Sequence, residues 1–109
     1  MESVKKNDEF RYVYQNGKSY ANKYLVMYLC KNGREESRLG ISVSKKVGNS
    51  VVRHRLARLI RESCRLNGEA FHSGWDIIIV VRPAAKGKTY MEINSAVLHL
   101  AGLHRLLKV

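Results

Sequence analysis

The chain has 109 residues, of which 20 are Lys or Arg and 9 are Asp or Glu, so its formal net charge is +11. This length accommodates one domain, residues 1–109, with a single modest core. The charge excess indicates a polyanionic partner, either nucleic acid or an anionic membrane surface.

Several classes of protein are excluded by what the composition lacks. No apolar run approaches the roughly 18 residues of a membrane span, and the N-terminal residues include no apolar signal segment, so we expect a cytoplasmic protein. Cys30 and Cys64 show no metal-ligand spacing. We expect both cysteines to be reduced and partly buried.

The first predicted element is a helix that begins at Asn7, a candidate N-cap, and ends at Asn16-Gly17. Acidic residues follow the cap, where the helix dipole favours them. Phe10 and Tyr14 lie one turn apart and therefore share a face. The residues alone favour core packing as the role of this aromatic pair.

Residues 19–31 are predicted to form one long strand. One face carries Tyr24, Val26, Tyr28 and Cys30, and the other carries Leu25, Met27 and Leu29. Because both faces are apolar, each must be covered, either by core or by a binding groove. Asn32-Gly33 then predicts a hairpin turn.

A short strand at residues 40–44 is followed by a change to helical periodicity. Ile41 and Val43 point to one face of this strand and small residues to the other. Asn49 can cap a helix that starts near Ser50. The apolar face of that helix consists of Val52, Leu56, Leu59, Ile60 and Ser63, and the opposite face of His54, Arg58, Arg61 and Arg65, flanked by Arg53 and Arg55.

This basic helix is not explained by solubility alone. Like charges one turn apart repel each other, and Glu62 is the only acid within the helix. A surface selected only for solubility mixes the two signs of charge. Arginine forks onto phosphate oxygens, so the pattern favours a phosphate-binding helix over a solvated charged face.

The remaining chain predicts one more strand and one more helix. Residues 75–82 contain five successive aliphatic residues, Ile77 to Val81, and end before Pro83, which is typical of a buried strand. Thr89 and Glu92 have the spacing of a capping box, and a final helix should start there. We expect residues 105–109 to fray.

Residues 40–65, GISVSKKVGNSVVRHRLARLIRESCR, resemble the signature of the protein subunit of bacterial ribonuclease P. That pattern is roughly SKK-x-G-N-A/S-V-x-R-N-R followed by a basic helix. The matching residues are Ser44, Lys45, Lys46, Gly48, Asn49, Arg53, Arg55, Arg58 and Arg61. His54 stands where the family usually has Asn, and Ala57 where it often has Lys. The resemblance extends from Lys5 to about Leu100.

The resemblance implies an α+β fold. We expect a single-domain sandwich of about four mixed strands packed with helices, of the ribosomal protein S5 domain 2-like type. This family has a left-handed β-α-β crossover at the basic helix, whereas such crossovers are normally right-handed. The resemblance also assigns the Tyr28 face of residues 19–31 to a groove and the Leu-Met-Leu face to the helix layer.

The resemblance implies a non-catalytic subunit of an endoribonuclease. In this family the RNA subunit hydrolyses precursor tRNA with Mg²⁺ and releases the 5′ leader. We therefore expect Mg²⁺ bound mainly by the RNA, no organic cofactor and no obligate protein partner. The residues expected on the catalytic RNA are Lys45, Lys46, Asn49, Arg53, His54, Arg55, Arg58, Arg61 and Arg65, and those expected on the leader are Phe10, Tyr14, Tyr28, Ser42 and Ser44.

The chain's own titratable residues support this division of labour. Its acids are scattered, and none pairs with a histidine at metal-ligand spacing. His54 lacks the second acid or base that nuclease chemistry needs. His72, His99 and His104 also lack ligand spacing. We expect no catalytic and no metal-binding residue in this chain.

Three other functions are compatible with a strongly basic chain. A generic basic RNA-binding or ribosomal protein shares the charge but has no need of an aromatic groove. A helix-turn-helix DNA reader needs another helix directly before the basic one, and a strand is predicted there instead. A binder of anionic membranes needs Trp or Phe on the apolar face of the helix, which has neither.

Overall fold

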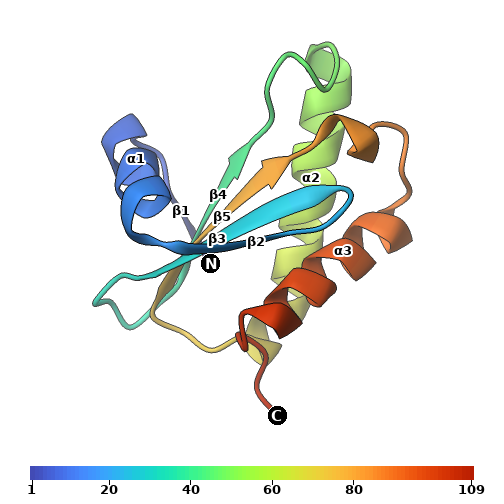
Figure 1. Ribbon diagram of the computed structural model, residues 1–109. Coiled ribbons are helices and arrows are strands. Elements are labelled where there is room, and N and C mark those ends of the chain that lie inside the picture. The colour runs from blue at the N-terminus through green and yellow to red at the C-terminus, as the bar shows by residue number, and fades with distance from the viewer.

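The computed structural model describes residues 1–109, which form a five-stranded mixed sheet with helices on both faces (Figure 1). The elements are β1 (Glu2–Ser3), α1 (Asn7–Asn16), β2 (Lys18–Ala21), β3 (Leu25–Lys31), β4 (Arg38–Ser42), α2 (Ser50–Asn67), β5 (Trp75–Val81) and α3 (Tyr90–Leu103). Short 3-10 turns occupy Gly68–Ala70 and Pro83–Ala85. The strand order is β1-β4-β5-β3-β2. The α+β sandwich is confirmed, with one strand more than expected. None of the helices has the length and apolar character that a membrane span requires.

β5 is the central strand, which explains its continuous aliphatic sequence. It pairs in parallel with β4 and antiparallel with β3. Ile77 and Ile79 point into the main core, which α2 and α3 cover, whereas Ile78 joins a smaller cluster with Val4 and Val13 on the α1 side. A strand covered on both faces needs apolar residues, which Ile77 to Val81 supply, while the buried Asp76 at its start is paired with Arg38. The predicted buried strand is confirmed.

The side chains of β3 are divided between the same two layers. Leu25, Met27 and Leu29 are buried in the main core, whereas Tyr28 packs against the smaller cluster. The predicted facing of Tyr28 and of the Leu-Met-Leu residues is confirmed. Tyr24, however, precedes β3 and packs against the main core, so its assignment to the Tyr28 face is wrong.

The prediction of one strand over residues 19–31 is wrong, because a turn at Asn22 divides it into β2 and β3. The Asn22 backbone N–H donates to the Leu25 carbonyl (2.9 Å). The Asn22 Oδ1 accepts from the backbone N–H groups of Tyr24 (3.2 Å) and Leu25 (3.0 Å). An Asn that bonds the backbone just after itself creates a turn, and the apolar alternation through this turn concealed it.

The turn at Asn32-Gly33 is present but makes no hairpin. Gly33 has a φ of +68°, and the Asn32 Oδ1 accepts from the Arg34 backbone N–H at 2.8 Å. β3 and β4 are nevertheless not neighbours, because β5 lies between them. The predicted hairpin is therefore wrong. The strand expected at residues 40–44 is also displaced, to Arg38–Ser42.

Three helix starts were predicted from capping residues, and two are confirmed. The Asn49 side chain accepts from the Val52 backbone N–H at the start of α2 (3.0 Å), and Thr89 and Glu92 form the capping box of α3. The N-cap of α1 lies one residue earlier than predicted, at Lys6, whose backbone N–H donates to the Glu9 carboxylate (3.3 Å).

α2 connects β4 to β5, which are neighbouring parallel strands. This is the β-α-β crossover that the resemblance implies, and its left hand stays a prediction. Ser50–Asn67 buries Leu56, Ile60 and Ser63 against the sheet and α3, as its helical period predicts.

The C-terminal residues are docked, so the prediction that they fray is wrong. Leu106 is 1% exposed, and its backbone N–H donates to the Ala101 carbonyl (2.9 Å). The His72 N–H donates to the Leu106 carbonyl and the Lys108 N–H to the Ala70 carbonyl, both at 2.7 Å. These bonds attach the tail to the segment after α2.

Replacing Leu106 by Ala should lower the free energy of unfolding by about 2–5 kcal/mol, because a fully buried side chain leaves a cavity. The measurement is urea denaturation followed by circular dichroism. Leu103→Ala is the matched control, since Leu103 is 43% exposed, and it should cost less than about 1 kcal/mol. Equal losses in the two variants would show that the tail is not docked.

Candidate nucleic-acid interface

α1 and the C-terminal end of β4 form an open groove of about 540 Å³. Its lining consists of Asn7, Phe10, Arg11, Tyr14, Ile41, Ser42 and Val43. Three of the residues predicted to bind a leader, Phe10, Tyr14 and Ser42, are therefore brought together. Ser44 is exposed but is not part of this lining, and its carbonyl accepts from the Val47 N–H in the turn before α2 (3.1 Å).

An aromatic wall forms the α1 side of the groove. The rings of Phe10 and Tyr14 are 6.3 Å apart between centroids, and Tyr14 meets Tyr28 edge-to-face at 4.9 Å. Phe10 and Tyr28 are half-buried against the smaller cluster, whereas Tyr14 is 38% exposed. Edge-to-face packing of aromatic rings is a favoured geometry that helps to hold the Tyr14 ring in place. Phe10 and Tyr14 thus both pack and line the groove, whereas Tyr28 of β3 supports Tyr14 and is not part of the lining.

Gly40 allows Phe10 to lie directly on β4. A Cβ atom at Gly40 would be 2.8 Å from the Phe10 Cζ and 2.6 Å from the Ile78 Cδ1. Real carbon atoms do not approach so closely, so any other residue would push the Phe10 ring outward. The depth of the groove therefore depends on this glycine.

A second cavity of about 330 Å³ continues the concave surface toward α2. Phe10 and Ile41 line both cavities, and Arg61 and Arg65 line the second. The aromatic wall and the basic helix therefore border one continuous surface over β4.

The predicted basic face of α2 is confirmed as a face. His54, Arg58, Arg61 and Arg65 are exposed, as are the residues that lead into the helix, Lys45, Lys46 and Asn49. Arg65 binds Glu62 through two of its nitrogens (2.6 and 3.1 Å), whereas Arg58 and Arg61 contact no acid. Arg58 and Arg61 are thus the arginines of α2 most available to an anion.

The flanking arginines are less accessible than the sequence suggests. Arg53 and Arg55 are half-buried. Arg55 Nη2 donates to the Lys88 carbonyl (2.9 Å), which attaches α2 to the loop before α3. Arg53 Nε is buried without a hydrogen-bond partner. Substitution of either residue would disturb the fold as well as the surface charge.

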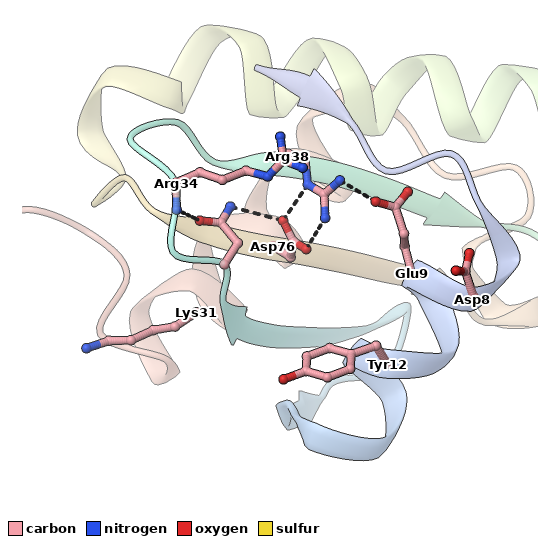
Figure 2. A pocket seen from close by; sticks show the side chains of 8 residues that line it. Asp8, Glu9, Tyr12, Lys31, Arg34, Arg38 and Asp76 are labelled. Carbon is pink, nitrogen blue, oxygen red and sulfur yellow. Dashed lines mark hydrogen bonds and ion pairs between the residues drawn. The ribbon is translucent and has the colours of Figure 1, made fainter.

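An ion network holds α1 against the sheet (Figure 2). Arg38 of β4 donates to Asp76 of β5 through Nε (2.9 Å) and Nη2 (2.6 Å), and to Glu9 of α1 through Nη1 (2.6 Å). Asn32 Nδ2 donates to the Asp76 Oδ1 (3.0 Å). The network lies beside a polar cavity of about 420 Å³. It ties the aromatic wall to the two strands beneath it.

The three charged groups of the network are ionised at neutral pH. Burial alone would raise the pKa of Asp76, but hydrogen bonds from Arg38 and Asn32 outweigh it and leave that pKa lowered. The hydrogen bond from Arg38 also lowers the pKa of Glu9. Both carboxylates in turn raise the pKa of Arg38.

The chain contains no cluster of three or more His, Cys, Asp or Glu side chains that could hold a metal ion. Cys30 and Cys64 are both free, and burial raises the pKa of the Cys64 thiol to about 12, so this thiol is unreactive. His104 Nε2 lies 2.8 Å from the Met27 carbonyl, and His99 Nδ1 lies 3.2 Å from the Asn22 side chain. His99 and His104 thus have structural partners.

A family model of ribonuclease P matches residues 1–104. The chain belongs to the ribonuclease P protein family. It is 64% identical over 106 residues to the ribonuclease P protein component of Lachnoclostridium phytofermentans, covering 97% of this chain and 91% of that protein. It is 50% identical over 107 residues to the component of Clostridium kluyveri, covering 94% and 96%.

Solved structures of ribonuclease P proteins have the same fold. The protein from Staphylococcus aureus superposes with a TM-score of 0.92 at 36% identity, covering 99% of each chain. The protein from Thermotoga maritima gives a TM-score of 0.84 at 31% identity, covering 92% of this chain and 94% of that one. The resemblance to the ribonuclease P family that residues 40–65 indicated is confirmed.

Two features of the interface were missed in the sequence. Arg11 lines the groove. Helical spacing could have predicted this, because Arg11 lies one turn after Asn7 and next to Phe10 on the predicted helix. The network of Arg38, Glu9 and Asp76 joins residues far apart in the chain, so no local sequence pattern predicts it.

Gly40→Ala should lower the free energy of unfolding by about 1–3 kcal/mol, because the added methyl overpacks the contact with Phe10 and Ile78. Gly102→Ala is the matched control. A Cβ at Gly102 meets nothing within 4 Å, and Ala in a helix is up to about 1 kcal/mol more favourable than Gly, so this variant should be slightly stabilised. Urea denaturation measures both; a stabilised Gly40→Ala would contradict the close approach.

Low pH should reduce the stability of the folded protein through the ion network of Arg38, Glu9 and Asp76. Since the pKa of Glu9 is lowered in the folded state, its contribution is complete above the usual carboxylate pKa of about 4 and is lost as the pH falls below it. The urea midpoint should therefore fall from pH 6 to pH 3 more steeply in the wild type than in Glu9→Gln. Glu2→Gln is the control, since Glu2 only meets exposed Arg34 at 3.9 Å. Identical pH profiles for wild type and Glu9→Gln would exclude this role.

Proposed function

We propose that this ribonuclease P protein binds the catalytic RNA through α2 and holds the 5′ leader of precursor tRNA in the groove beside α1. The observation that carries the proposal is the continuous surface over β4, which joins an aromatic wall to an arginine face. Single-stranded RNA binds to aromatic side chains through its bases, and a folded RNA binds to arginines through its phosphates. A generic RNA-binding protein has no need of both.

The catalytic RNA would dock on the exposed basic residues of α2 and its approach. Arg58 and Arg61 contact no acid, and Lys45 and Lys46 add two exposed cations just before the helix. The exposed His54 ring supplies a further hydrogen-bonding group. Cations placed between two RNA molecules reduce the repulsion between their phosphates. The protein would thereby lower the Mg²⁺ concentration that the RNA requires.

The leader would stack on Tyr14, whose ring is supported by Phe10 and Tyr28. Base stacking on an aromatic ring contributes about 1–3 kcal/mol and tolerates every base. This tolerance suits leaders of differing sequence. Ser42 on the floor of the groove supplies a hydroxyl for hydrogen bonds to the strand.

The chemical step would belong to the RNA subunit. Mg²⁺ supplies charge stabilisation and an activated water in phosphodiester hydrolysis. The side chains of this protein do not fit such an ion, because no three carboxylates, thiols or imidazoles lie together. The proposal thus assigns Mg²⁺ mainly to the RNA, requires no other protein subunit, and locates the holoenzyme in the cytoplasm, where bacteria transcribe tRNA.

The test is cleavage of precursor tRNA at low Mg²⁺ by the cognate catalytic RNA alone, with the wild-type protein, and with Arg58→Ala/Arg61→Ala. The wild type should restore cleavage at the mature 5′ end, and the double variant should lose affinity for the RNA. With a slope of about −0.7 to −0.9 per phosphate contact, the loss of two contacts should also reduce the salt dependence of binding by about 1.4–1.8.

Lys86→Ala/Lys108→Ala is the matched control, because it removes the same charge from exposed positions on the loop after β5 and on the C-terminal tail. It should retain most activity. If both double variants lose affinity equally, α2 is not the docking surface. If the wild-type protein adds nothing to the RNA, the proposed function is wrong for this chain.

A further inference from the structure

α1 presents two parallel stripes of side chains to the groove. Phe10 and Tyr14 form the inner stripe, against Gly40 and Tyr28. Asn7 and Arg11 form an outer stripe with the same spacing, and all four line the cavity. Residues four apart on a helix are separated by about 6 Å along its axis, so the outer stripe follows the aromatic one at an even distance.

Arg11 is the only cation that lines this groove, and no acid pairs with it. Its neighbour Glu9 is engaged by Arg38 (2.6 Å), and Asp8 lines the polar cavity that contains this ion pair. Arg11 itself is exposed and makes no hydrogen bond to another side chain. A guanidinium with all five donors free can bind an anion without first breaking an ion pair.

We propose that Arg11 binds a backbone phosphate of the leader while the bases of the leader stack along Phe10 and Tyr14; this inference rests on the proposed function of the groove. Stacking holds a base and tolerates any base, but it leaves the backbone free to slide. The guanidinium forks onto phosphate oxygens in a defined plane. The two stripes together fix which side of the strand faces the sheet.

The test uses the holoenzyme reconstituted from this protein and its catalytic RNA. Precursor tRNAs carry a leader in which one phosphate at a time is replaced by an uncharged methylphosphonate. Arg11→Gln should weaken binding of the normal precursor about 2- to 5-fold and reduce its salt slope by about 0.7. At one leader position, the methylphosphonate should weaken binding to the wild type but not to Arg11→Gln.

Two variants serve as controls. Lys108→Gln removes one exposed charge far from the groove and should leave the affinity for every precursor unchanged. Arg11→Lys keeps the charge and should recover part of the loss. Mature tRNA, which has no leader, should bind the wild type and Arg11→Gln equally.

The inference is overturned if methylphosphonates weaken the wild type and Arg11→Gln by the same factor at every position. Tyr14→Leu in the same assay separates this failure from a failure of the proposed function. If Tyr14→Leu loses leader affinity and Arg11→Gln does not, only the role of Arg11 is wrong. If neither variant loses leader affinity, the groove is not the leader site.

Discussion

Arg38 makes the only ion pair that joins α1 to the sheet, and the groove depends on where α1 lies. α1 buries a single residue completely, Val13, so its apolar attachment is small. The Arg38 guanidinium meets Asp76 with two nitrogens and Glu9 with a third. A planar fork of this kind specifies direction as well as distance, which a lysine cannot do. Well-packed apolar residues often stabilise a fold as well as a buried ion pair does, so we interpret the network as fixing the orientation of α1.

The two helices that border the interface, α2 and α1, are held in place by different interactions. α2 is anchored through Leu56 and Ile60 in the main core, together with α3. Because of this burial, the opposite face of α2 can carry several arginines. Their mutual repulsion is small compared with the stabilisation from the buried apolar side chains. α1, in contrast, is held by one small apolar cluster and the Arg38 network. The surface proposed to meet the catalytic RNA is thus anchored in the main core, and the wall proposed to meet the leader is attached through a smaller cluster.

The features that were predictable from the sequence have strong local periods. The basic helix, its Asn49 cap, the Thr89–Glu92 capping box and the buried strand β5 each follow from spacing along a short stretch of chain. The predictions that were wrong concern segments whose structure is determined by contacts with distant parts of the chain. The side chain of Asn22 ends one strand and starts the next, and β5 inserts between β3 and β4. In the tail, bonds to residues that follow α2 hold Leu106 in place. The same holds for the interface, since the arginine face was visible in the sequence and the Arg38 network was not.

The position of the first residues has a practical consequence for labelling this protein. β1 pairs with β4, and Met1 lines the second cavity together with Arg61 and Arg65. A fluorophore or affinity tag added before Met1 would therefore sit over the arginines proposed to meet RNA. The other end of the chain lies beyond α3, well away from α1 (Figure 1), and Val109 is fully exposed. Immobilisation through the C-terminus would leave the groove beside α1 open.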